Sequence, residues 1–316
     1  MSTVESRAIR FHEVGEPLDV LREDRTSISY PGEGRIRVRV AAAGLNPADW
    51  ELCRGFMPGT LPRGIGFDVA GTVDAVGDGV DDVAIGDLVF GSSDFAVQPS
   101  AGAADFAIMN LWFAVPAGLD AVHAAVLPMV LQTAVWTLDL LNVAEGETVL
   151  IHGAGGMVGY AAVQVALRRG ARVIATAGPT FAGDLEAFGA LTTPYGDGMV
   201  ERVRQLADGP IDYVLDASRP STGAIAALVE IAGDATHVVT IGNHAEARTQ
   251  GARVNIDELM AAGGFPSSDF LRDYAALAAA GEFSIPVAAT FRLDEWRTAA
   301  ELSLSGAPHG KLVLVP

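Results

Sequence analysis

The 316-residue chain is half apolar and only 19% charged, a composition that supports large buried cores and argues against disorder. Its length is enough for two domains. The formal net charge of −18 at pH 7 repels nucleic acid and anionic membranes, so we expect neither as a partner. The single cysteine, Cys53, excludes an intrachain disulfide and a four-cysteine zinc site, and it fits a reducing cytoplasm, where we expect the protein to act.

The first part of the chain, residues 1–118, has the pattern of a β-rich domain. Strand-like runs at residues 36–42 and 68–76 alternate with turns rich in glycine, proline and aspartate, and few windows show helical periodicity. Glycines recur at short intervals between residues 64 and 91. This pattern predicts a small barrel with tight corners.

Residues 121–141 form the longest apolar stretch, but His123, Pro128, Gln132 and Asp139 interrupt it. We interpret it as a buried helix with a break at the proline, and we expect no membrane-spanning segment. The N-terminus lacks the apolar region of a signal peptide.

Strands and helices alternate after this stretch. Residues 148–152, 172–177, 211–217 and 237–241 have the pattern of buried strands, and residues 157–169, 184–188 and 199–207 have helical spacing. Such alternation predicts βαβ units in a doubly wound, parallel α/β sheet. The tail adds expected helices at 270–280 and 293–304 and expected strands at 286–291 and 311–315.

A glycine cluster between an expected strand and an expected helix is the strongest chemical signal. It runs through Gly153, Ala154, Gly155, Gly156, Met157, Val158 and Gly159. Gly153 would make a tight exit from the strand, Gly155 and Gly156 would let the backbone approach a pyrophosphate, and Gly159 would let helix and sheet pack closely. The N–H groups of the helix N-terminus would bind the phosphates without a basic side chain. The alternative is a glycine-rich turn without a ligand, since Val158 breaks the strict G-x-G-x-x-G form.

The end of the second strand bears on the choice of dinucleotide. NAD sites usually carry a carboxylate there, whereas this chain has Ala177 and Gly178, and its next acid is Asp184. No basic residue for NADP lies between positions 174 and 190. Backbone N–H groups near Gly178 and the Thr180 hydroxyl could bind a 2′-phosphate. We therefore favour NADP(H) over NAD(H).

Several motifs in order resemble the zinc-independent, zeta-crystallin-like quinone oxidoreductases of the medium-chain dehydrogenase/reductase superfamily. They are GLNPAD at residues 44–49, GFDVAGTV at 66–73, the glycine cluster, and HGKLVL at 309–314. The resemblance spans nearly the whole chain. It implies a GroES-like β-barrel domain at residues 1–119 and 262–316, a Rossmann domain at 120–261, an active site between them, and a homodimer.

The resemblance also implies that the zinc-ligand positions of related alcohol dehydrogenases are Asn46, Phe67 and about Met129 in this chain. None of these side chains binds zinc well, so we expect no metal. The family often carries a tyrosine where this chain has Glu51, so no tyrosine proton donor is expected in this loop.

Individual residues follow from these patterns, each with a structural alternative. Asn46 could bind substrate or simply form a turn, and Asp49 could act as a cleft acid or cap the next helix. The remaining expected cofactor contacts, several of them by resemblance, are Thr133, Ala177, Gly178, Thr180, Tyr195, Gly242, Asn243 and Lys311. Thr133 could instead pack in the core, Tyr195 could be a surface aromatic, and Gly242 with Asn243 could be a plain turn. His152 is interpreted as a strand residue and not as a catalytic base.

These features together predict NADPH-dependent hydride transfer to a quinone or an α,β-unsaturated carbonyl, without zinc. The alternatives are a metal-free carbonyl or alcohol oxidoreductase and a low-turnover NADPH-binding sensor.

Overall fold

The computed structural model describes residues 3–96 and 100–316. The chain divides into two compact units. Unit 1 comprises Met1–Met129 and Asp269–Pro316, and unit 2 comprises Val130–Ser268. The divisions at 129/130 and 268/269 lie a short way along the chain from the expected 119/120 and 261/262.

Unit 1 is rich in strands, as its turn-rich sequence predicted. Its elements in chain order are β1 (Val4–Phe11), α1 (Pro17–Val20), β2 (Leu21–Ile28), β3 (Ile36–Gly44), α2 (Pro47–Cys53), β4 (Arg63–Gly64), β5 (Asp68–Val76), β6 (Leu88–Ser93), β7 (Phe106–Ala114), α3 (Ala121–Ala124), α11 (Phe270–Ala279), β14 (Val287–Arg292), η2 (Leu293–Glu295), α12 (Trp296–Ser305) and β15 (Lys311–Val315).

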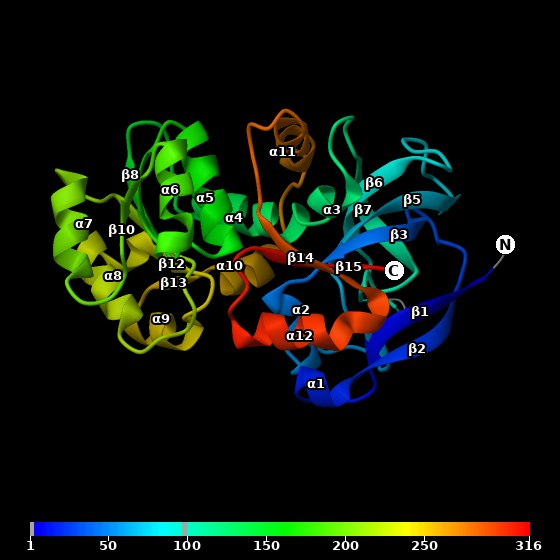
Figure 1. The fold of residues 1–316 in the computed structure, drawn as a ribbon. Coiled ribbons are helices and arrows are strands. Elements are labelled where there is room, and N and C mark those ends of the chain that lie inside the picture. The colour runs from blue at the N-terminus through cyan, green and yellow to red at the C-terminus, as the bar shows by residue number, and fades with distance from the viewer. Residues whose placement is uncertain (1–2, 97–99) are drawn as a thin grey trace. The chain divides into compact units, whose positions relative to one another are not determined.

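Four antiparallel strands of unit 1 close into a small barrel. Strand β3 pairs with β5, β5 with β6, β6 with β7, and β7 again with β3. The expected β-barrel is therefore present. The C-terminal strands extend it: β15 pairs with β3, and β14 runs parallel to β15, so the red and orange end of the chain lies beside the blue β3 in Figure 1.

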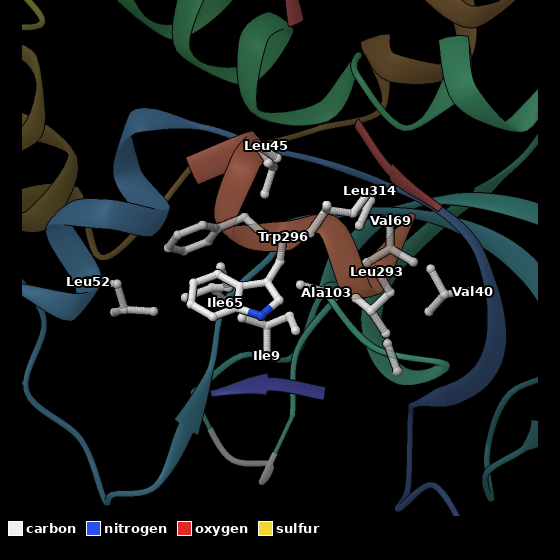
Figure 2. Packing of buried hydrophobic residues seen from close by; sticks show 14 of the residues in the cluster. Ile9, Val40, Leu45, Leu52, Ile65, Val69, Ala103, Leu293, Trp296 and Leu314 are labelled. Atoms are coloured by element: carbon white, nitrogen blue, oxygen red, sulfur yellow. The ribbon is translucent and has the colours of Figure 1, made fainter. Parts of the chain in front are cut away.

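The core of unit 1 explains why the C-terminal segment belongs to it. Trp296 and Leu293, from the C-terminal segment, pack among residues of the N-terminal part such as Ile9 and Ile65 (Figure 2). Leu293 is 1% exposed and Ile9 is fully buried. Burial of each such side chain contributes about 1.5–3 kcal/mol, so the two separated segments of unit 1 stabilise each other.

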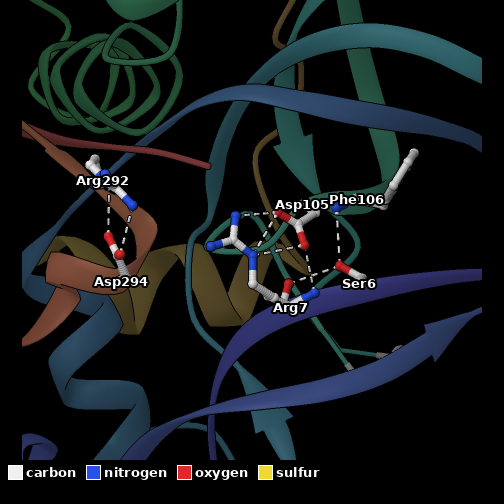
Figure 3. A network of polar contacts seen from close by, with 6 residues as sticks. All are labelled: Ser6, Arg7, Asp105, Phe106, Arg292 and Asp294. Carbon is white, nitrogen blue, oxygen red and sulfur yellow. Dashed lines mark hydrogen bonds and ion pairs between the residues drawn. The ribbon is translucent and has the colours of Figure 1, made fainter.

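A polar network also joins the first strand of unit 1 to the start of β7. The Arg7 guanidinium contacts Asp105 with Nη2 2.7 Å from Oδ1, and the Asp105 carboxylate accepts the backbone N–H of Arg7 (Figure 3). The Ser6 hydroxyl accepts the backbone N–H of Phe106. These contacts fix the register of β1 against the barrel.

Unit 2 alternates strands and helices. Its elements are α4 (Pro128–Leu140, which begins in unit 1), β8 (Thr148–His152), α5 (Met157–Arg168), β9 (Arg172–Thr176), α6 (Pro179–Phe188), β10 (Leu191–Thr193), α7 (Met199–Ala207), β11 (Tyr213–Asp216), α8 (Ala224–Ala232), η1 (Ala235–His237), β12 (Val238–Thr240), α9 (His244–Gln250), β13 (Arg253–Val254) and α10 (Asn255–Ala262).

The strands of unit 2 form one parallel sheet in the order β10-β9-β8-β11-β12-β13. This is the predicted doubly wound α/β sheet, and β8, α5 and α7 begin where the sequence placed them. Helix α6 begins earlier than expected, because Pro179 occupies its first turn after Gly178. Helices α8, α9 and α10 were not predicted from the sequence.

The apolar stretch Ala121–Leu140 is, among the described residues, long and apolar enough for a membrane span, and 67% of its most apolar 18-residue window is buried inside the protein. It is divided into α3 and α4, with Pro128 opening the second helix, as the sequence predicted. A mostly buried core helix has the same length and composition.

Candidate functional site: the carboxyl edge of the unit 2 sheet

Ligands of doubly wound sheets bind at the carboxyl ends of the strands, where the strand order reverses. In unit 2 the order reverses between β8 and β11, which pair side by side and end at His152 and Asp216. The glycine cluster follows β8 directly. The predicted nucleotide loop therefore lies at the switch point of the sheet.

Two glycines of the loop are required by close packing. Gly153 has φ of +79°, and a Cβ there would lie 2.6 Å from the Ser218 backbone nitrogen. A Cβ on Gly159 would lie 2.7 Å from the Gly153 carbonyl oxygen and 2.8 Å from the Ala154 Cα. Gly153 thus makes a tight exit from β8, and Gly159 lets α5 pack against the strand end, as the sequence predicted for these two positions.

The middle of the loop faces open space. A Cβ on Gly155 would meet no described protein atom within 4 Å, and one on Gly156 would meet only ordinary contacts. Gly156 caps the N-terminus of α5 without a side-chain hydrogen bond. The first N–H groups of a helix, here those of Met157, Val158 and Gly159, have no partner within the helix. This cradle of backbone donors fits the pyrophosphate of a dinucleotide.

A buried carboxylate network holds the neighbouring strand ends. Asp216 is fully buried at the end of β11. Its Oδ1 accepts the N–H and hydroxyl of Ser218, and its Oδ2 accepts the Thr240 hydroxyl at 2.6 Å and the Asn243 amide at 2.7 Å. Asp216, Ser218 and Thr240 were not among the predicted site residues. An acid and two hydroxyls at the ends of two expected strands were the available signal.

The network decides what Gly242 and Asn243 present to a ligand. Asn243 is buried, and its Oδ1 accepts the Ser221 N–H while its amide donates to Asp216 and Ser218. A Cβ on Gly242 would lie 2.6 Å from the Ser218 carbonyl oxygen. Both residues sit at the predicted strand end, but their contacts there order the loops, and the half-buried Ser218 is the side chain nearest the surface.

His152 is engaged inside the sheet. Its Nδ1 lies 2.8 Å from the Thr176 hydroxyl of the neighbouring strand β9, and burial lowers the pKa of the imidazole. The same hydroxyl accepts the Gly153 N–H. A neutral, buried ring that fixes the loop agrees with its interpretation as a strand residue.

The end of β9 is the expected adenosine subsite. Ala177 donates its N–H to the Thr193 carbonyl, Gly178 caps α6, and Thr180 is exposed on the first turn of that helix. The Tyr195 side chain is 63% exposed, and its hydroxyl lies 3.8 Å from where a Cβ on Gly178 would stand. The structure thus brings the predicted Gly178 and Tyr195 together across two strands.

Two further residues of unit 2, Thr133 and Asp184, were considered from the sequence in connection with the cofactor. Thr133 is half-buried on α4, and its carbonyl accepts the Thr137 hydroxyl. Asp184, the first acid after β9, accepts a hydrogen bond from the Tyr160 hydroxyl at 3.3 Å. Asp184 is exposed on α6 and does not stand at the end of β9.

In unit 1, Asn46 and Asp49 form a capping box at the start of α2. Asp49 is fully buried, and its carboxylate accepts the N–H of Asn46 at 2.8 Å and that of Gly66 at 2.6 Å. Burial raises the pKa of Asp49 to about 7, against the lowering effect of these two hydrogen bonds. The geometry supports the capping interpretation of Asp49 over that of a cleft acid.

Lys311, expected to contact the cofactor, is instead buried in the same cluster. Its Nζ donates to Asn46 Oδ1 at 2.5 Å and lies 3.8 Å from Asp68 Oδ2. Asn46 in turn donates to Asp68 at 2.9 Å, and Asp68 accepts the Met129 N–H. Burial lowers the pKa of Lys311 and raises that of Asp68 to about 6. A buried ammonium needs a carboxylate partner, and Asp68 supplies it; the sequence pattern gave no sign of that pairing.

The positions that match zinc ligands in related dehydrogenases carry other chemistry here. The Asn46 amide is hydrogen-bonded within the cluster, the Phe67 ring packs at a tilt against the Phe95 ring with centroids 4.3 Å apart, and Met129 offers a thioether. Across residues 3–96 and 100–316, no three His, Cys, Asp or Glu side chains gather as a metal site. Burial raises the pKa of the Cys53 thiol to about 12.

Comparisons with known proteins agree with the fold. Residues 32–114 match the alcohol dehydrogenase GroES-like domain, and residues 188–314 match a family described as zinc-binding dehydrogenase. A quinone oxidoreductase of Sus scrofa is 37% identical over 178 residues, which are 54% of this chain and 52% of that protein. Erythronolide synthase EryA2 of Saccharopolyspora erythraea is 38% identical over 190 residues, 58% of this chain and 5% of the synthase. The matched part thus spans about half the length of the first of these relatives and a small part of the second.

The solved structure of a quinone oxidoreductase from Coxiella burnetii superposes with a TM-score of 0.79 and 28% identity, covering 99% of this chain and all of that one. The likeness therefore extends over both units taken along the chain. These findings place the protein in the medium-chain dehydrogenase/reductase superfamily, among proteins similar to quinone oxidoreductases.

Proposed function

We propose that the protein is an NADPH-dependent oxidoreductase that reduces a quinone or an α,β-unsaturated carbonyl without zinc. The observation that carries this proposal is the open glycine loop at the switch point of the unit 2 sheet. Gly155 faces empty space beside the N-terminal donors of α5, while Gly153 and Gly159 are packed against the strand ends. The matches to quinone oxidoreductases support the reaction class.

The roles of the chain's own residues follow from their contacts. The backbone donors at the start of α5 bind the pyrophosphate, and the Asp216 network fixes the β11 and β12 loops beside it. When bound, the cofactor supplies a hydride from nicotinamide C4. The protein positions the cofactor and the acceptor and stabilises the charge that develops between them. Positioning alone accounts for much of the acceleration in such reactions.

Zinc independence is supported by the side chains at the ligand positions. An amide, a phenyl ring and a thioether are poor ligands for Zn²⁺ compared with thiolate and imidazole. Without a Lewis acid, a conjugated acceptor is a better substrate than a primary alcohol, because its product anion is delocalised.

Solvent or a ribose hydroxyl donates the proton that the product anion takes up after hydride transfer. Glu51 stands where related proteins often carry a tyrosine, and its exposed carboxylate pairs with Arg54 at 2.7 Å. The same substitution favours a second candidate, a low-turnover NADPH-binding sensor. We further propose a homodimer, which size-exclusion chromatography with light scattering would test.

Oxidation of NADPH and NADH, followed at 340 nm with 1,4-benzoquinone and with a simple enone, tests the proposal. The metal content of the same preparation is measured, and the assay is repeated with a chelator. We expect chelator-resistant oxidation that prefers NADPH. Loss of activity with the chelator would contradict the zinc-free reaction. Cofactor binding without oxidation by any acceptor would favour the sensor.

Gly155→Val tests in the same assay whether the glycine loop binds the cofactor. The added side chain points into space free of described protein atoms, so the fold should persist while the pyrophosphate is displaced. We expect the variant to keep its melting temperature and to lose cofactor binding and turnover together. Turnover at the parent rate would contradict the assignment of the loop.

A further inference from the structure

Arg202 of α7 holds the loop that carries Tyr195. Its Nε donates to the Thr193 hydroxyl at 3.0 Å, its Nη1 to the Asp197 carbonyl at 2.7 Å, and its Nη2 to the Pro194 carbonyl at 2.8 Å. These acceptors bracket Tyr195 on both sides. The planar guanidinium thereby fixes the backbone of the exposed loop on both sides of Tyr195.

The same guanidinium is connected to the end of β9 through Thr193. Thr193, which accepts a hydrogen bond from Arg202, also accepts the Ala177 N–H through its carbonyl at 3.1 Å. Ala177 precedes Gly178, and the Tyr195 hydroxyl lies beside Gly178. Thr193 therefore connects Arg202 to the end of β9. At this strand end, dinucleotide sites distinguish a ribose 2′-hydroxyl from a 2′-phosphate.

A positive charge near this strand end would strengthen the binding of a 2′-phosphate beyond what backbone N–H groups and a hydroxyl supply. Residues 174–190 contain no lysine, arginine or histidine, and the chain as a whole has a formal charge of −18. A guanidinium has five N–H donors, and three of those of Arg202 are used by the loop in the described structure, which leaves two for an anion. Arg202 brings from α7 the cation that the β9–α6 segment lacks.

We propose that Arg202 is the specificity-determining residue for the adenosine 2′-phosphate, both by its charge and by holding Tyr195 beside Gly178. This inference rests on the proposed use of NADPH. Its ligand is a phosphomonoester on a ribose, and its mode of action is a charge-assisted contact combined with a fixed loop. A nucleotide without the 2′-phosphate gains nothing from the charge.

Binding of two nucleotide fragments to the full chain tests the inference without turnover. Isothermal titration of 2′,5′-ADP and of 5′-AMP compares ligands that differ by the 2′-phosphate alone. We expect the parent protein to prefer 2′,5′-ADP. Arg202→Gln should weaken 2′,5′-ADP by about 10- to 100-fold, the usual range for a hydrogen bond to a charged group, and leave 5′-AMP unchanged.

Arg204→Gln is the matched control, because Arg204 lies on the same helix and its guanidinium pairs with the exposed Glu230. It removes the same charge from the chain and should leave both affinities unchanged. Equal losses for both ligands in Arg202→Gln would reduce Arg202 to a structural role and overturn the inference, as would no loss at all. A parental protein that does not prefer 2′,5′-ADP would overturn it as well.

If Arg202→Gln does not fold, Arg202→Lys carries the test. The lysine keeps the charge and loses the planar fork, so the preference for 2′,5′-ADP should fall without vanishing; an unchanged preference overturns the proposal. Failure of the proposed function would show itself separately. A protein that binds 2′,5′-ADP in this way but oxidises no cofactor with any acceptor leaves the Arg202 assignment intact.

Discussion

The two units of this protein bury polar groups in different ways. In unit 1, Asp68 and Lys311 are buried together with a second carboxylate, Asp49, so charge is set against charge. In unit 2, the buried carboxylate of Asp216 is surrounded by neutral donors, the hydroxyls of Ser218 and Thr240 and the amide of Asn243. The comparison separates two tasks. Breaking a buried ion pair is costly, which suits a fixed scaffold, whereas neutral donors at loop ends order a surface that must still admit a ligand.

The largest expected effect tests the charged cluster. Lys311→Met removes the ammonium and leaves Asp68 buried without its counter-charge. We expect a loss of about 3–5 kcal/mol in the free energy of unfolding, measured by urea denaturation.

Two variants sharpen this prediction. Adding Asp68→Asn to Lys311→Met should recover part of the loss, because no buried charge then lacks a partner. Thr240→Val, which removes one neutral donor from Asp216, should cost only about 0.5–1.5 kcal/mol. Equal losses for Lys311→Met and Thr240→Val would contradict the difference drawn between the units.

The second prediction concerns pH. The pKa of Asp49 is about 7 in the folded protein, whereas an aspartate in the unfolded chain has its ordinary pKa of 3.8. The folded state therefore holds this proton more tightly, so the contribution of Asp49 to stability is full below about pH 4 and is lost as pH rises towards 7. Each pKa unit corresponds to about 1.4 kcal/mol.

Asp49→Asn isolates the pH-dependent contribution of Asp49 to stability, because the amide does not titrate. The free energy of unfolding of the parent protein, minus that of the variant, should fall between pH 4 and 7 and level off above. A difference that is constant over this range would show that the two backbone hydrogen bonds to Asp49 outweigh its burial.

The third and smallest effect compares two glycines of one loop. Gly159→Ala places a methyl group 2.7 Å from the Gly153 carbonyl oxygen, and we expect a loss of about 1–3 kcal/mol, typical of an overpacked interior. Gly155→Ala faces open space and should change stability by less than about 0.5 kcal/mol. Thermal unfolding monitored by circular dichroism measures both. If Gly155→Ala proved the more destabilising, the open cradle would not exist as described.

Much of the fold follows from local pattern. Strands β5, β8 and β15 begin and end at the residues that the sequence predicted, because β-branched runs between turn residues specify extended backbone locally. The helices α8, α9 and α10 were missed although α8 is strongly apolar, since short segments after loops carry little periodic signal.

In the candidate site, too, features set by local sequence could be predicted and contacts between distant residues could not. The glycine loop could be predicted, because a tight turn and a close helix need glycine whatever the rest of the chain does. Lys311 was assigned to the cofactor by resemblance, yet its ammonium binds Asn46, a residue 265 positions away. Nothing local to either residue encodes that partnership.

The sequence by itself determined the alternation of strands and helices from β8 to α7, the nucleotide loop and the absence of an acid after β9, since each depends on neighbours along the chain. Only the tertiary structure decided which buried charges meet, that Asp49 caps a helix, and that Arg202 contacts Thr193 at the end of β10. Those pairings depend on strand register and helix packing between distant segments. The free energy of burying a charge depends on which partner the folded chain brings to it.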